Sequence, residues 1–440
     1  MTHLPPVLSE PDLKQEKGFF QVPPLRIATL SIHSSPLGEL GTEETGGMSV
    51  YVRELSRELG RSGQSVDIYT CADGGRDASE LLLSENVRLI HLDIGYQGRL
   101  TKNILPGRLP EVFQSLATYI ESNGLRYDLI HSHYWLSGQV GSLAQDRWDT
   151  PHVAMFHTTG VAKRVACSRE REPFQRLIAE RRLAQVSDRI LAATEKERDL
   201  LRKYYGVAAR KIGMVPCGVN LERFRPVAGA LARREMGIRD DRFVVLYVGR
   251  FAPVKGLDRL IAAAAHLRSY RELTLLIIGG DGFQTQGAAE LRRLAKRASI
   301  EDIVKFQGRV EHDLLPLYYS AADVLVVPSY YESFGLVALE SLACGTPVIA
   351  TPVGAMETLI REGETGLLLD NPSPRSLASA IERFMLNPPK VATCRDRIRA
   401  SVLNYDWQKI ASSVMQEYRT ALQFRSPRNE RTRAQGVCSW

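Results

Sequence analysis

Short apolar runs that alternate with longer amphipathic stretches begin at Leu25, and the same alternation begins again at Phe243. Strands that alternate with helices predict a parallel sheet covered by helices on both faces. The first set of runs covers residues 25–30, 66–70, 87–92, 129–131, 152–156 and 189–193, and the second covers residues 243–248, 273–278, 304–306, 324–327 and 347–350. We therefore predict an α/β chain with two doubly wound Rossmann-like domains that face a central cleft.

A turn-rich segment, residues 216–226, separates the two sets and indicates an interdomain linker. The last helical pattern begins at Tyr405, and its sequence does not say which domain it packs on. The predicted divisions are a disordered N-terminal tail (1–23), an N-terminal domain (24–220), a C-terminal domain (221–404), a C-terminal helix (405–424) and a disordered basic tail (425–440).

Composition limits the classes of function. Charged residues make up 24% and hydrophobic residues 44% of the 440 residues, as in ordinary soluble globular proteins. The net charge of +7 comes without a basic stripe interleaved with aromatics, so we expect no nucleic acid partner. The six cysteines lack pair spacing and no apolar run is long enough to span a membrane, which favours the cytoplasm. The oligomeric state stays open.

Two acids, Glu332 and Glu340, follow the apolar run that ends at Pro328. If the segment between them were helical, about 12 Å of rise would separate them, with only about 80° of rotation. That distance suits the two ends of a nucleotide-sugar, the sugar and the ribose. The alternative is that the acids only complement a helix macrodipole.

Two cations, Arg250 and Lys255, lie in the loop after the first strand of the second domain. Cations at a strand end can neutralise a diphosphate leaving group as its charge develops. In the first domain, Gly46 and Gly47 open a helix and allow the backbone to approach an anion. The alternatives are ordinary surface charges and a plain turn, and the turn at residues 279–282 is predicted to be mainly a connection.

Histidines end two strands of the first domain. His133 is followed by Tyr134 and Trp135, which indicates a site wall more than a core, and His157 ends the next strand in the same way. No third ligand with helical spacing accompanies these histidines, and the chain lacks an Asp-x-Asp motif. We therefore predict neither a metal nor another cofactor.

Together these motifs resemble those of the retaining glycosyltransferases of the large family that includes sucrose-phosphate synthase and many bacterial sugar transferases, which share the GT-B fold. The resemblance covers about residues 25–424. Within the family, residues 33–52 and 128–141 are most similar to the N-acetylglucosaminyl transferases that act on inositol phosphate in the mycothiol pathway. The resemblance implies an acceptor-binding N-terminal domain and a nucleotide-sugar-binding C-terminal domain.

The resemblance also implies a role for each matching residue. Arg250 and Lys255 bind the diphosphate, Glu332 contacts the transferred sugar, and Glu340 binds the ribose. His133 meets the sugar or helps to position the reacting centre. The implied catalytic residues are His133, Arg250, Lys255 and Glu332. The implied donor-binding residues are Gly46, Gly47, Arg250, Lys255, Val310, Glu332, Phe334, Gly335, Leu336 and Glu340. The implied acceptor-binding residues are Ser49, Lys102, Tyr134, Thr158 and Arg176.

The chain departs from the inositol-phosphate enzymes at two places in the acceptor half. Ser49 stands where they have an asparagine that contacts the acceptor, and residues 157–163 differ from their usual pattern. Serine is shorter than asparagine and lacks the two-donor amide. The residue roles that the resemblance implies therefore transfer to this chain more firmly for the donor half than for the acceptor half.

The implied reaction moves a hexose, most readily from UDP-GlcNAc or UDP-glucose, to an acceptor hydroxyl on a phosphorylated polyol or sugar. It proceeds with retention by a front-face route in which the leaving diphosphate accepts the proton. One alternative is a mannosyl- or glucosyltransferase for a lipid-linked or polysaccharide acceptor, with Arg164, Arg169 and Arg171 at a peripheral membrane contact. A second is a catalytically silent nucleotide-sugar sensor.

Overall fold

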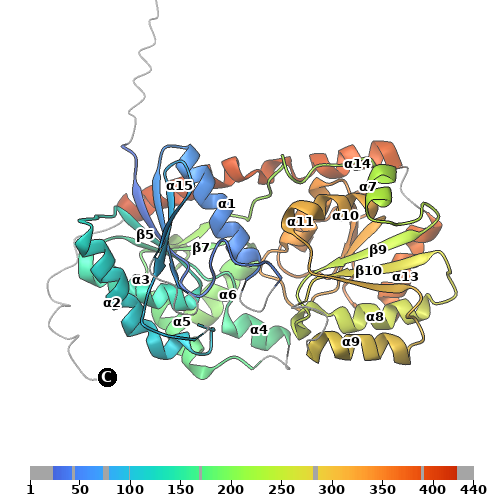
Figure 1. The fold of residues 1–440 in the computed structure, drawn as a ribbon, viewed down its shortest axis with the longest axis horizontal. Coiled ribbons are helices and arrows are strands. Elements are labelled where there is room, and N and C mark those ends of the chain that lie inside the picture. The colour runs from blue at the N-terminus through green and yellow to red at the C-terminus, as the bar shows by residue number, and fades with distance from the viewer. Residues whose placement is uncertain are drawn as a thin grey trace, which may run out of the picture.

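The computed structural model describes residues 23–41, 45–72, 79–98, 100–167, 171–280, 286–387 and 391–423. These residues form two lobes that lie side by side, each built around its own sheet (Figure 1). The predicted tails lie outside the described residues except for Pro23. Arg169 and the second half of the predicted turn, residues 281–282, also lie outside them.

The first lobe contains an eight-stranded sheet in the order β3-β4-β2-β1-β5-β6-β7-β8. Neighbouring strands are parallel except for the edge pair of β3 and β4. The strands are β1 (Arg26–Leu30), β2 (Ser65–Cys71), β3 (Glu80–Ser84), β4 (Val87–Leu92), β5 (Leu129–His133), β6 (His152–Met155), β7 (Arg189–Ala192) and β8 (Ile212–Met214). The sequence did not predict β3 and β8, because β3 is largely exposed and β8 has only three residues.

The second lobe contains a six-stranded, fully parallel sheet in the order β11-β10-β9-β12-β13-β14. The central strands are continuous apolar runs because both faces of such a sheet are buried. The strands are β9 (Phe243–Val248), β10 (Leu273–Ile278), β11 (Val304–Gly308), β12 (Val324–Val327), β13 (Val348–Ala350) and β14 (Gly366–Leu368). β14 was not predicted, since it is a three-residue edge strand.

Helices pack on the faces of both sheets, so the predicted pair of doubly wound Rossmann-like domains is confirmed. The predicted limits of the domains, 24–220 and 221–404, stay predictions. The first-lobe helices are α1 (Gly47–Arg61), α2 (Leu109–Ser122), α3 (Tyr134–Trp148), α4 (Gly160–Ala166), α5 (Phe174–Val186) and α6 (Glu195–Tyr205). The remaining helices are α7 (Gly229–Glu235), α8 (Leu257–His266), α9 (Gln286–Arg297), α10 (Leu315–Ala321), α11 (Leu336–Ala343), α12 (Met356–Leu359), α13 (Pro374–Leu386), α14 (Val391–Ala400) and α15 (Trp407–Gln423).

The order of the strands places a switch point in each sheet. In the first lobe, β1 lies between β2 and β5, and in the second lobe β9 lies between β10 and β12. Connections leave in opposite directions at such a point and open a crevice at the carboxyl ends of the strands, where ligands of α/β sheets bind. The loops after β1, β5, β9 and β12 are therefore the expected binding loops.

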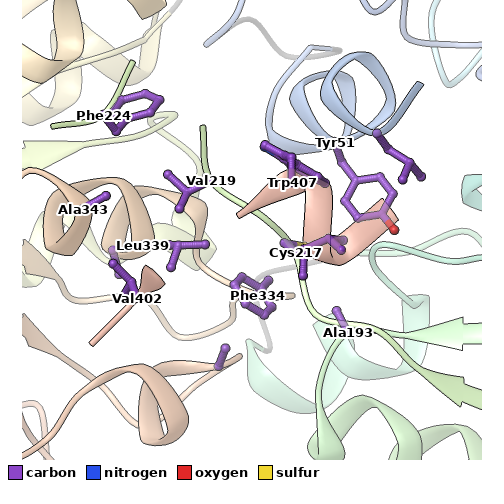
Figure 2. Close-up of a cluster of buried hydrophobic side chains, with 14 of the residues drawn as sticks. Tyr51, Ala193, Cys217, Val219, Phe224, Phe334, Leu339, Ala343, Val402 and Trp407 are labelled. Carbon is purple, nitrogen blue, oxygen red and sulfur yellow. The ribbon is translucent and has the colours of Figure 1, made fainter. Parts of the chain in front are cut away.

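The last helix, α15, returns to the first lobe (Figure 1). Its Tyr418 hydroxyl lies 2.7 Å from His131 Nδ1 on β5, and its Glu417 accepts a hydrogen bond from Arg189 on β7. Figure 2 shows the buried cluster where the lobes meet, with Tyr51 of α1, Cys217 of the linker, Phe334 and Trp407. The packing of α15, which the sequence left open, thus joins both lobes through one apolar cluster.

Candidate active site

A cavity of about 320 Å³ lies between the two lobes at their switch points. Three of the residues predicted for the site, His133, Ser49 and Arg176, do not line it and are buried behind its wall. The predicted residues that do line it are Gly46, Gly47, Lys102, Tyr134, Thr158, Arg250, Lys255, Val310, Glu332, Phe334, Gly335, Leu336 and Glu340. Sequence motifs spread over about 290 positions therefore converge on one cavity.

Lys255 and Glu332 meet at the ends of the adjacent strands β9 and β12. Lys255 Nζ donates to Glu332 Oε1 over 2.7 Å, and the Ser329 hydroxyl donates to the same oxygen over 2.8 Å. Lys255 ends a short 3-10 turn, and Gly256 follows in the left-handed region at φ 65°. A Cβ at Gly256 would lie 2.0 Å from the carbonyl oxygen of Pro328, so only glycine lets the two loops pack this closely.

Glu340 lies on α11, one turn inside the helix that follows this loop. Its carboxylate accepts from Tyr319 OH over 2.8 Å and from His312 Nε2 over 2.9 Å. Two arginines, Arg53 and Arg223, approach the other ring nitrogen of His312, Nδ1. Arginine can only donate, so Nδ1 accepts from them and Nε2 is the ring nitrogen that donates to Glu340.

The amino end of α1 faces these second-lobe residues from the first lobe. An added Cβ at Gly47 would lie 3.2 Å from Leu336 Cδ1, and one at Gly46 would lie 4.0 Å from Arg250 Nε. The glycine pair therefore brings backbone close to Arg250 without side chains in between. The amino end of a helix also favours an anion.

Two residues on the first-lobe side of the cavity have backbone angles that are uncommon outside glycine. Tyr134, at the end of β5, has φ 76°, and His157, after β6, has φ 57°. Such strain tends to occur where a site holds a side chain in place. The centroid of the Tyr134 ring lies 4.5 Å from the centroid of the His33 ring. It lies 4.8 Å from the guanidinium carbon of Arg176.

Histidine side chains form part of this wall and support it from behind. His133 is fully buried, and its Nδ1 lies 2.9 Å from Nε2 of His157, which lines the cavity. Burial lowers the pKa of His33, His131, His152 and His157 to about 3, and it lowers the pKa of His133 as well. These rings are therefore neutral at physiological pH and add no positive charge to the cavity.

Arg176 lies in a buried network beneath the same wall. Its guanidinium donates to Glu180 and Glu172, each over 2.6 Å, and to the carbonyl and hydroxyl oxygens of Thr158 over 2.8 and 3.1 Å. The predicted contact of Arg176 with an acceptor phosphate stays a prediction, as does that of Ser49. The Ser49 hydroxyl lies 2.7 Å from the hydroxyl of Ser34.

His157, which the sequence placed at a strand end like His133, lines the cavity. Lys163, Arg309 and His312 also line it and were not predicted as site residues. Arg309 and His312 follow the carboxyl end of β11, and that position was the available signal, whereas Lys163 lies in α4. Arg309 also forms a 2.7 Å ion pair with Glu39 of the first lobe, a contact between the two lobes beside the cavity.

Within the described ranges, no group of three or more His, Cys, Asp or Glu side chains lies where it could hold a metal ion. Metal independence stays a prediction. In the same part of the chain, no helix combines the length and the apolar character needed to cross a membrane.

Two facing Rossmann-like domains with both switch points at one cavity form the architecture of the GT-B transferases. Two family models match the chain: the one described as Glycosyltransferase Family 4 over residues 45–223, and the one described as Glycosyl transferases group 1 over residues 230–401. D-inositol 3-phosphate glycosyltransferase 2 from Catenulispora acidiphila is 38% identical over 409 residues, which cover 91% of this chain and 96% of that protein. The chain therefore belongs to this glycosyltransferase family and is a glycosyltransferase.

Solved structures agree with this assignment. Sucrose-phosphate synthase (tll1590) from Thermosynechococcus elongatus superposes with a TM-score of 0.83 at 35% identity, over 91% of this chain and 99% of that one. HepE from Anabaena in complex with UDP-glucose gives a TM-score of 0.72 at 20% identity, over 90% of this chain and all of that one. The second likeness shows the fold alone.

Proposed function

We propose that this protein transfers a hexose, with retention, from a nucleoside-diphosphate sugar to a hydroxyl of a phosphorylated polyol or sugar. UDP-GlcNAc and UDP-glucose are the preferred donors. The observation that carries the proposal is the pairing of Lys255 with Glu332 in the same cavity that the Gly46–Gly47 helix start lines from the other lobe. A cation and the amino end of a helix can bind the diphosphate of such a donor, and an acid can bind its sugar hydroxyls.

In this proposal each group of the donor meets one part of the site. Arg250, Lys255 and the backbone at Gly47 hold the diphosphate, Glu332 binds the transferred sugar, and Glu340 binds the ribose. A bound diphosphate draws Lys255 away from Glu332, which leaves the carboxylate oxygen to accept from a sugar hydroxyl. His133 acts on the sugar through His157, because His133 itself is buried.

The acceptor proposal is supported by the cations on the first-lobe side and by the relatives. Lys102 and Lys163 both line the cavity beside Tyr134 and Thr158, where a phosphate group would meet them. D-inositol 3-phosphate glycosyltransferases are 38% identical to this chain, and sucrose-phosphate synthase is 35% identical. The names of both kinds of enzyme contain a phosphorylated polyol or sugar, so we propose an acceptor of that class.

The proposed chemistry needs no protein nucleophile. The acceptor hydroxyl attacks the anomeric carbon from the face that the diphosphate leaves, and the leaving diphosphate takes the proton of that hydroxyl. Arg250, Lys255 and the amides of the α1 start stabilise the charge that develops on the diphosphate. Closure of the two lobes around the bound donor would exclude water that would otherwise hydrolyse it, with Arg309 and Glu39 as one contact between the lobes.

The test uses two acceptors that differ only in a phosphate group, myo-inositol and D-inositol 3-phosphate, with UDP-, GDP- and ADP-hexoses as donors. Release of nucleoside diphosphate reports turnover, and the proton NMR coupling at the new anomeric centre reports the stereochemistry. We expect transfer to the phosphorylated acceptor only, with an α-linked product from an α-linked donor. Equal transfer to both acceptors, or an inverted product, would contradict the proposal.

A lipid-linked acceptor is the second candidate, favoured by apolar side chains exposed on α4 and α5. Val165 is 69%, Phe174 73% and Ile178 55% exposed. Arg164 and Arg171 are exposed in the same region. Sedimentation with vesicles that contain or lack anionic lipid tests this candidate. The candidate requires that the protein bind only the anionic vesicles and that it turn over a lipid-linked acceptor.

A further inference from the structure

Glu172 lies between two cations at the edge of the acceptor side. Its Oε1 accepts from Lys163 Nζ over 2.9 Å, and its Oε2 accepts from the Arg176 guanidinium over 2.6 Å. The side chain is 9% exposed, and Lys163 lines the cavity. One carboxylate therefore uses both of its oxygens on donors that could equally hold an anionic ligand.

The two acids on Arg176 differ in how firmly they are held. Glu180 is fully buried, accepts from the backbone N–H of Gly160 with both oxygens over 3.0 Å, and accepts from the Tyr205 hydroxyl. Glu172 has only the two cations as hydrogen-bond partners within the contacts that the structure describes. It also precedes α5, which starts at Phe174, so its side chain can turn away without unwinding the helix.

Charge sets the competition between Glu172 and an arriving anion. Burial acts to raise the pKa of Glu172, but Arg176 and Lys163 lower it, and the net pKa lies below its ordinary value. The carboxylate is therefore ionised at neutral pH. A phosphate that enters beside it meets a like charge and must displace it from the cations, which costs binding free energy.

We propose that Glu172 is an internal counter-ion that competes with the acceptor's phosphate for Lys163 and Arg176 and so sets acceptor selectivity. This inference rests on the proposed function, because it assumes a phosphorylated acceptor. A neutral acceptor leaves the carboxylate in place and gains nothing from the two cations. A phosphorylated acceptor displaces it from Lys163, which lines the cavity, and only by taking its place reaches the otherwise buried Arg176, at the cost of part of its affinity.

The variant Glu172→Gln removes the charge with little change in shape. Glu121→Gln is the matched control, because Glu121 pairs with Arg147 over 2.9 Å on the exposed face of the same lobe. Calorimetric titration with inorganic phosphate measures anion affinity, and steady-state kinetics with D-inositol 3-phosphate separates KM from kcat. Melting curves verify the fold, and Glu172→Ala serves as a second charge-removing variant.

We expect phosphate to bind Glu172→Gln about tenfold more tightly than wild type, with a matching fall in KM and little change in kcat. The control should bind as wild type does.

Unchanged or weaker phosphate binding in the folded variants would overturn the inference while the wild-type activity upholds the proposed function. Failure of both variants to fold would also overturn it, since the carboxylate would then be required for structure. Absence of acceptor binding by the wild type would overturn the proposed function and this inference together.

Discussion

The ammonium group of Lys255 lies 2.7 Å from Glu332 Oε1, although the two residues are 77 positions apart in the chain. Their loops leave the adjacent parallel strands β9 and β12 at the same edge of the sheet. The contact couples the cation assigned to the diphosphate with the acid assigned to the sugar. In the proposed function, a diphosphate takes over Lys255 and thereby frees an oxygen of Glu332 for the sugar.

Arg176 is expected to stabilise the fold whatever its part in acceptor binding. The variant Arg176→Ala leaves Glu180 buried with an uncompensated charge and removes the donors to Thr158, so we expect a loss of about 3–5 kcal/mol in the free energy of unfolding. Urea denaturation measures this loss. Arg147→Ala, which removes an exposed ion pair with Glu121, should cost less than about 1 kcal/mol. Equal stability of the two variants would refute the buried network.

Glu340 is expected to govern donor affinity more than turnover. The variant Glu340→Gln replaces a carboxylate that accepts from His312 and Tyr319, and it weakens any hydrogen bond from ribose hydroxyls. We expect the donor KM to rise about tenfold with kcat within about twofold, because the ribose is remote from the reacting bond. Glu382→Gln is the control, since Glu382 also accepts from a tyrosine hydroxyl, that of Tyr270. A fall in kcat without a change in KM would contradict the assignment.

Gly47 is expected to be required for donor binding but not for folding. Alanine is a better helix former than glycine by about 1 kcal/mol. The added Cβ of Gly47→Ala would, however, lie 3.2 Å from Leu336 Cδ1, inside the cavity. We predict an unchanged or higher melting temperature together with a donor KM raised about tenfold. Gly107→Ala, where the Cβ meets nothing within 4 Å, should leave the donor KM unchanged.

The buried histidines predict a loss of stability in mild acid. The pKa of His33, His131, His152 and His157 is about 3 in the folded protein against 6.5 ordinarily. The unfolded chain therefore binds more protons between about pH 3 and 6.5, so the free energy of unfolding falls as the pH falls through this window. Glu197, whose pKa burial raises to about 7, acts in the opposite direction but is a single group.

Urea denaturation at a series of pH values from 5 to 8 tests this prediction. Each imidazole contributes up to about 1.4 kcal/mol per pH unit to the slope within the window. The variant His152→Asn should reduce the slope by about one such contribution, whereas a substitution of the exposed His266 should not. A free energy of unfolding that does not change between pH 5 and 7 would contradict the neutral, buried state of the cluster.

The fold was largely predictable because most strands are continuous apolar runs. The run at Phe243–Val248 is β9 without a change of bounds, since a strand buried on both faces needs apolar residues throughout. The unpredicted strands β3, β8 and β14 lie at sheet edges, where β3 is largely exposed and the other two have only three residues each. The packing of α15 on the first lobe depends on distant partners such as His131, which no local pattern reveals.

The site was predictable where a loop follows a strand and less so where side chains meet across the chain. Arg250, Lys255 and Glu332 follow β9 and β12 directly, so their position in the chain indicated the cavity. His312 was missed because its bond to Glu340 joins residues 28 positions apart. His133 was expected at the cavity surface, but β5 is an inner strand whose residues are all buried, and His133 lies behind His157.

The rate of donor turnover in Lys255→Ala and Glu332→Gln tests the central claim most directly, since both residues belong to the proposed donor site. Release of nucleoside diphosphate with saturating donor and D-inositol 3-phosphate measures this rate. We predict a fall in kcat of about 100-fold or more in each variant, as for other groups that stabilise developing charge, while Lys296→Ala on the exposed face of α9 turns over as wild type does. Undiminished turnover in both site variants would contradict the assignment.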